Sequence, residues 1–185
     1  MKSRPRKKRV RERSLVKELE RLYARTADLV YRKGQHRDAL VFAQRLNSLL
    51  DDSDLIDKKA IDGSVHGNEV RALIAEAHQD WGAAVRYRRK KIALLKRLRM
   101  SIRSGQSITA DELAPPSYVS ACYADLAIAL RNAHRIRAAR LAILEAERVS
   151  SLAGNRFEYS KLKRELLQAN PDGGRRSSPK TRKVS

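Results

Sequence analysis

Apolar residues recur every three or four positions along most of this chain, which is the spacing that lines one face of an α-helix. No segment alternates apolar and polar residues between turn residues, so the pattern predicts no strand. We therefore predict an all-α protein of paired helices joined by short turns. The seven helices are expected at about residues 15–33, 36–50, 55–78, 81–104, 117–132, 135–152 and 155–169.

Residues that begin or end helices delimit these elements. Ser14 can cap the first helix, Gly34 can end it, and Asn155 can cap the last helix. Residues 1–13 and 170–185 carry too few apolar side chains to form a core, so we expect a disordered basic arm and a disordered basic tail. The prediction is one helical domain, residues 14–169, between these two tails.

The net charge of +20 is concentrated in three segments. Met1–Ser14 has eight basic residues and one acid, Val85–Arg103 has nine and none, and Ala169–Ser185 has five and one. The rest of the chain carries equal numbers of both signs. Clustered positive charge raises the encounter rate with polyanions, whereas evenly spread charge mainly supports solubility.

The composition disfavours several classes of protein. The single Cys122 excludes an internal disulfide and a zinc site made of cysteines, and we expect it to be a small buried residue. The four histidines have no metal-binding spacing with a carboxylate, and the sequence has no glycine-rich phosphate loop or nucleophile elbow. We therefore predict no enzymatic activity, no metal and no cofactor.

The apolar runs also bear on location. None approaches the roughly 18 residues that a transmembrane segment needs, so no such segment is expected. With one cysteine and no span, we expect a reducing compartment, which is the cytoplasm, or the nucleus if the source is eukaryotic.

Three stretches of the chain, residues 23–46, 68–91 and 123–146, resemble one another. Antiparallel helices approach closely where both present small side chains, and the alignment has such residues at two positions. The first position holds Ala27, Ala72 and Ala127, and the second holds Ala39, Ala84 and Ala139. The turn between them falls at Gly34, Gln79 and His134. The alignment predicts three helical hairpins.

This arrangement resembles the tetratricopeptide repeat (TPR), a helix–turn–helix unit of about 34 residues. The resemblance covers about residues 20–53, 65–98 and 120–153, and the helix at 155–169 resembles the capping helix that often ends such arrays. Equivalent positions here lie 45 and 55 residues apart, because residues are inserted between the units. The resemblance therefore implies an α-solenoid or a bundle-like variant of it.

The first helix of each TPR hairpin lines a concave groove, where most members of the family bind a segment of another protein. The resemblance thus implies a non-catalytic scaffold whose partner is a protein or peptide segment. The matching groove positions of this chain are Arg21, Asp28, Tyr31, Arg32, His66, Glu69, Glu76, Ala124, Ile128, Arg131 and Asn132.

The predicted helix at 81–104 combines an apolar stripe, which belongs to the second hairpin, with a basic face. Like charges this close destabilise a bare helix, and a face that serves only solubility usually mixes both signs. We therefore expect contact with a polyanion. The residues expected to make it are Arg86, Arg89, Lys90, Arg97 and Arg103 in this helix, and Arg6, Lys7, Lys8 and Arg9 in the arm.

Three functions stay open at the level of sequence. The chain is a protein-binding scaffold with basic arms and a basic helix, a nucleic-acid or ribonucleoprotein-binding accessory protein, or a protein that lies on a membrane surface. Aromatic residues are scarce near the basic helix, so RNA or DNA would be held through its phosphate backbone. The membrane surface is least favoured, because the apolar stripe matches a buried hairpin core.

Overall fold

A computed structural model describes residues 6–52, 58–103 and 115–169 of the chain. Within these ranges it contains α-helices and one π-helical turn but no strand, which confirms the all-α prediction. The elements are α1 (Arg6–Ala27), η1 (Asp28–Arg32), α2 (His36–Asp52), α3 (Lys58–Gly63), α4 (Val65–Ala77), α5 (Trp81–Arg103), α6 (Pro116–Asn132), α7 (Ile136–Leu152) and α8 (Ser160–Gln168). The predicted tail 170–185 lies outside the described residues.

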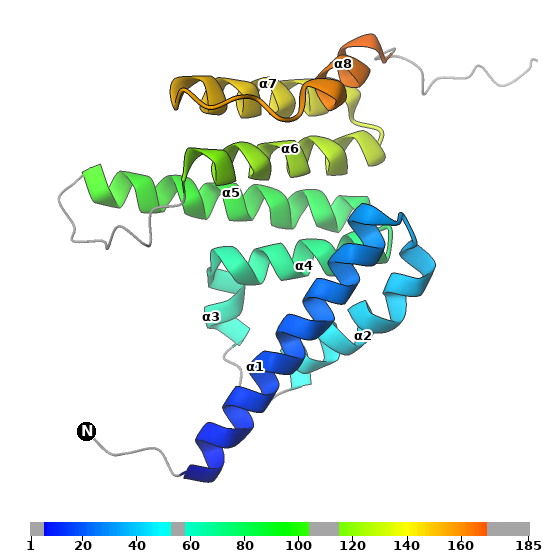
Figure 1. Cartoon of the computed structure of the whole chain (residues 1–185), viewed down its shortest axis with the longest axis vertical. Helices are drawn as coiled ribbons and strands as arrows, with labels where there is room; N and C mark the ends of the chain where they lie inside the picture. Colours follow the sequence, from blue (N-terminus) through cyan, green and yellow to red (C-terminus); the bar gives the residue numbers. More distant parts are fainter. Residues whose placement is uncertain (1–5, 53–57, 104–114, 170–185) are drawn as a thin grey trace, which may run out of the picture.

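Three pairs of consecutive helices form the body of the molecule. α1 packs with α2, α4 with α5, and α6 with α7, while α5 also contacts α6 and so joins the second pair to the third. The helices α4 to α7 lie side by side in one stack, and α1 and α2 cross it at an angle (Figure 1). α8 packs on α7 at the far end of this stack.

The aligned alanines lie in the contacts between these helices. Five of the six are fully buried: Ala39, Ala72, Ala84, Ala127 and Ala139. The sixth, Ala27, packs against a core cluster that contains Ala39. Alanines let the helix backbones approach closely, so they explain the tight packing of each pair.

The turns of the three hairpins share one backbone conformation. Gly34, Gln79 and His134 have φ angles of 63°, 56° and 57°, which is the left-handed conformation that often ends a helix. In the second and third turns the next residue donates its N–H to a carbonyl five positions earlier. In the first turn this bond spans six positions, because η1 contains one additional residue.

Three predicted boundaries are wrong. α1 begins at Arg6 rather than Leu15, so residues 6–13 of the expected disordered arm are helical; Arg, Lys and Glu are good helix formers and nothing breaks the run. The helix predicted at 55–78 is two helices, because Ser64 leaves the helical conformation and caps α4. α8 begins at Ser160 rather than at about residue 155, because residues 155–157 have no regular structure and residues 158–159 form a turn.

Gly67 allows α3 and α4 to cross closely. A Cβ atom at this position would overlap the backbone oxygen of Ile61, whereas a Cβ on Gly63 would meet nothing within 4 Å. Gly67 is therefore required by the crossing, because a side chain at this position would collide with α3.

Candidate functional site

The basic residues of α5 lie on two faces with different environments. Arg88 and Lys91 are buried, with 2% and 1% of their surface exposed, on the face that contacts α4 and α6. Both belong to the nine cations counted in Val85–Arg103, but neither was among the residues expected to contact a polyanion. Leu98 of the same helix is exposed, because the C-terminal end of α5 extends past α4 and α6 (Figure 1).

Arg88 is the centre of a buried network that joins the three hairpins. Its Nε and Nη2 atoms donate to the two carboxylate oxygens of Glu76 on α4, at 3.0 and 3.1 Å. Its Nη1 donates to Asp125 on α6 at 3.1 Å. Tyr31 of η1 donates its hydroxyl proton to Glu76 at 2.6 Å and accepts a hydrogen bond from Arg88. Charge-assisted, bidentate hydrogen bonds are among the strongest in proteins, so this network ties together η1, α4, α5 and α6.

The electrostatics of this network favour the charged form of Arg88. Burial opposes the charge of Arg88, but Glu76 and Asp125 raise its pKa above the ordinary value. Burial and the neighbouring Glu76 raise the pKa of Tyr31, so its hydroxyl stays protonated. Burial also raises the pKa of Asp125, although Arg88 opposes this shift. These groups satisfy one another and thereby hold the hairpins together.

Lys91 forms a second network one helical turn further along α5. Its Nζ lies 3.0 Å from the carboxylate of Glu69 and 4.7 Å from the ring centre of Tyr118. Tyr118 donates its hydroxyl proton to the same carboxylate at 3.1 Å. Burial alone would raise the pKa of Glu69, but Lys91, with Arg88 and Tyr118, holds this pKa below its ordinary value. Glu69 is therefore stabilised as a carboxylate.

The opposite face of α5 is exposed and carries only cations among its charged residues. Within the described part of the chain, the ion pairs of α5 are formed by Arg88 and Lys91 and by none of the exposed cations. These exposed cations are Arg86, Arg89, Lys90, Lys96 and Arg97. They extend over roughly 16 Å of helix. We call this surface the basic face of α5.

The other predicted polyanion-binding residues are less fully described. Arg103 lies in the last turn of α5, and Arg6, Lys7, Lys8 and Arg9 lie in the first turn of α1. Their side chains lie outside the described residues. Their contact with a polyanion stays a prediction.

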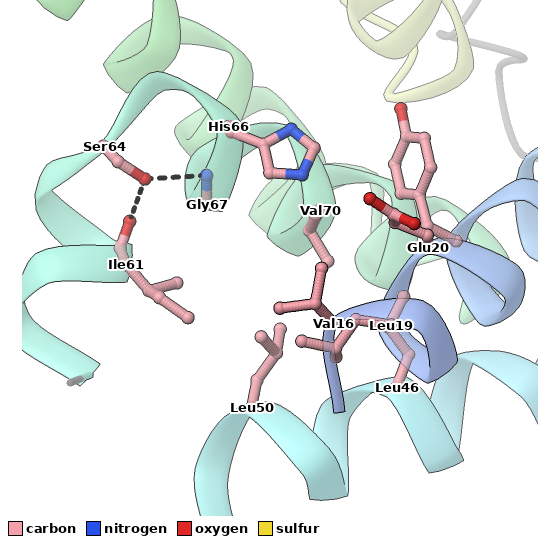
Figure 2. A pocket seen from close by; sticks show the side chains of 11 residues that line it. Val16, Leu19, Glu20, Leu46, Leu50, Ile61, Ser64, His66, Gly67 and Val70 are labelled. Carbon is pink, nitrogen blue, oxygen red and sulfur yellow. Dashed lines mark hydrogen bonds between the residues drawn. The ribbon is translucent and has the colours of Figure 1, made fainter. Parts of the chain in front are cut away.

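An apolar pocket of about 430 Å³ opens between α1, α2 and α4. Figure 2 shows the side chains of Val16, Leu50 and Val70 pointing toward one another, with Ser64 hydrogen-bonded to backbone atoms at the edge. His66 adds an imidazole to the lining. A pocket of this size with an apolar lining and few polar groups suits an apolar side chain or a small ligand.

A shallower groove of about 290 Å³ lies between α5 and α7, with α6 as its floor. We call it the α5–α7 groove. Its lining comes from three helices: Arg89 and Lys96 of α5, Tyr123, Leu126 and Leu130 of α6, and Ala138, Leu141, Ala142 and Glu145 of α7. The groove therefore borders the basic face of α5 and combines cations with apolar side chains.

The structure places three of the predicted groove residues in the two buried networks. Tyr31 and Glu76 meet in the Arg88 network, and Glu69 belongs to the Lys91 network. Ala124 is fully buried in the core of α6, so its prediction as a contact residue is wrong. It occupies a helix face that packs against neighbouring helices, where a small residue is needed.

The other predicted groove residues have separate environments. Asp28 lies within 4.0 Å of three cations, including Arg32, and Arg131 forms an ion pair with Glu165 of α8 at 3.3 Å. His66 lines the apolar pocket described above. Arg21 is exposed, and Ile128 and Asn132 are half-buried. For these residues, contact with a partner stays a prediction.

Neither a metal site nor a membrane span is found in residues 6–52, 58–103 and 115–169. No group of three or more His, Cys, Asp or Glu side chains in these ranges could hold a metal ion. No helix in these ranges combines the length and the apolar composition needed to cross a membrane.

Comparison of the chain with protein-family models, curated proteins and solved structures finds no match.

Proposed function

We propose that this chain is a non-catalytic interaction scaffold of TPR-like hairpins that binds a polyanion through the basic face of α5. The carrying observation is that five exposed cations share this face without an ion pair to a described residue. The nearby carboxylates of Glu69, Glu76 and Asp125 are bound to the buried cations instead. They are therefore not available to neutralise the exposed ones.

The spacing of these cations suits a linear polyanion. Cations along roughly 16 Å of helix can pair with successive anionic groups and release the counterions of the polyanion. None of the five lies beside an exposed aromatic side chain of α5, since Tyr87 is half-buried. Contact through backbone charge is thus better supported than base stacking.

The test compares two triple variants that remove equal charge. The first changes the basic face of α5: Arg86→Gln, Lys90→Gln and Arg97→Gln. The control changes three exposed cations near or in α8: Arg156→Gln, Lys161→Gln and Arg164→Gln. Fluorescence anisotropy with labelled duplex RNA should show a loss of more than about tenfold for the first variant and little for the control. Equal losses would mean that net charge, not this face, determines binding.

A second candidate function is the binding of a protein segment in the apolar pocket. The supporting observation is its position between α1 and α4, which are the first helices of the first two hairpins. Val16 lines the pocket and is 51% exposed, whereas Val41 of α2 is 68% exposed and lies outside the lining. Nuclease-treated purification from the native source should lose a co-purifying protein with Val16→Asp and retain it with Val41→Asp. Identical partners for both variants would count against the pocket.

A further inference from the structure

We infer that the polyanion recognised by α5 is an acidic segment of another protein, which places apolar side chains in the α5–α7 groove and carboxylates against the α5 cations. This inference rests on the proposed function, because it assigns the partner of the same basic face. It selects one chemical class, since an acidic segment with apolar anchors presents both kinds of group that the surface can bind.

The shape of the groove suits a peptide segment. Two helices form its walls, and α6 forms its floor. Ala138 and Ala142 lie one turn apart on the α7 wall, where their small side chains leave room for an incoming side chain. Binding of an amphipathic segment between helices is a recurrent mode of peptide recognition.

Apolar exposure beside the groove distinguishes an acidic segment from a nucleic acid. Leu141 lines the groove and is 70% exposed, and Leu144, which follows it by three positions on α7, is 41% exposed. Covering such side chains with apolar groups is favourable, whereas a phosphate backbone has no apolar group to cover them. The leucines therefore favour a partner with apolar side chains of its own.

The charge of the groove is complementary to a carboxylate. Arg89 and Lys96 line the α5 wall. The one acid of the lining, Glu145, is bound by Arg148 through two hydrogen bonds of 2.6 and 2.8 Å, so its charge is already compensated. A bound carboxylate would meet cations on the α5 side without an opposing free carboxylate on the α7 side.

Tyr123 gives an independent indication that the groove lacks a polar partner. It lines the floor of the groove, and its hydroxyl is buried without a hydrogen-bond partner among the described residues. The ring lies 5.6 Å from Nζ of Lys96. Buried polar groups are normally hydrogen-bonded, so this unpaired hydroxyl marks the floor of the groove as short of a polar partner.

The experiment measures the affinity of four probes for the full chain. The probes are a helical peptide with leucines on one face and glutamates beside them, poly-glutamate of equal charge, duplex RNA, and phosphatidylcholine vesicles containing phosphatidylserine. The groove variant is Leu141→Ser. The matched control is Leu152→Ser, since Leu152 is 75% exposed on the same helix but does not line the groove.

The leucine–glutamate peptide should bind the wild type at least about tenfold more tightly than poly-glutamate, because it also buries apolar surface. Leu141→Ser should remove this advantage, and Leu152→Ser should keep it. Neither change should affect the binding of duplex RNA.

Other outcomes separate the inference from the proposed function. If the peptide binds no more tightly than poly-glutamate while the α5 triple variant still weakens RNA binding, the inference fails and the proposed function stands. If vesicles bind and both leucine variants weaken them equally, the surface faces a membrane and the inference is overturned. If the α5 triple variant changes the binding of no probe, both proposals fail.

Discussion

Replacement of Arg88 by methionine tests whether the buried network holds the hairpins together. Methionine has a similar length and flexibility but cannot donate hydrogen bonds. The variant removes the donors to Glu76 and Asp125 and leaves Glu76 with the hydroxyl of Tyr31. Because only 5% of the Glu76 side chain is exposed, water cannot replace the lost partner.

The magnitude follows from this burial. Removing one partner of a buried ion pair costs about 3–5 kcal/mol, because the other charge stays buried and unpaired. Loss of the ion pair with Asp125 adds less to this cost, because the Asp125 side chain is 33% exposed and solvent screens its charge. A domain is stable by only about 5–15 kcal/mol, so Arg88→Met should remove about a fifth or more of the free energy of unfolding.

Urea unfolding followed by far-ultraviolet circular dichroism measures this loss. The midpoint of Arg88→Met should fall by roughly 2 M if the slope is about 2 kcal/mol per molar urea. Arg86→Met on the exposed face is the matched control and should stay within about 0.5 kcal/mol of the wild type. Glu76→Gln in the Arg88→Met background removes the unpaired charge and should recover part of the loss.

Two results would refute this reasoning. One is an Arg88→Met midpoint equal to that of Arg86→Met, which would mean that the buried network adds no stability. The other is a further loss on adding Glu76→Gln, which would mean that the unpaired carboxylate is not the source of the instability.

Three more predictions use the same urea assay. Gly67→Ala should lower the free energy of unfolding by about 1–3 kcal/mol because its Cβ meets the backbone of α3, whereas Gly63→Ala, with open space around it, should not be destabilising. Gln79→Gly and His134→Gly should each raise it by about 0.5 kcal/mol, because glycine adopts their positive φ angles without strain. The pKa of Glu69 is lowered in the folded state, so the stability that Glu69 contributes is present above its unfolded pKa of about 4.3. This stability is lost as the pH falls below that value. Glu69→Gln should therefore lose stability less steeply than the wild type below this pH; parallel curves would contradict the prediction.

The turns and the helix pairs could be predicted from the sequence because their determinants are local. A small residue on each helix and a turn residue between them specify a hairpin, and Gly34, Gln79 and His134 all lie in turns of left-handed conformation. The helical start of α1 was missed because its charge density favoured disorder, while the helix propensity of the same residues favours helix.

The buried networks were missed because residue type alone does not separate inner from outer cations. Arg88 lies four positions from Ala84 and from Ile92, and Lys91 lies four positions from Leu95, so the helical period places both on the apolar face. Glu69 and Glu76, the two acids of α4, lie seven positions apart and are their counterparts. The signal was present, but the pairing depends on how α4, α5 and α6 come together, which no local pattern shows.

The salt dependence of polyanion binding tests most directly whether the basic face of α5 makes the contact. The measurement is the logarithm of the association constant for duplex RNA against the logarithm of salt concentration, for the wild type and the α5 triple variant. Each phosphate contact contributes about −0.9 to the slope for a duplex such as B-DNA, so losing three cations should make the slope less negative by about 2–3. Equal slopes for the two proteins would contradict the account.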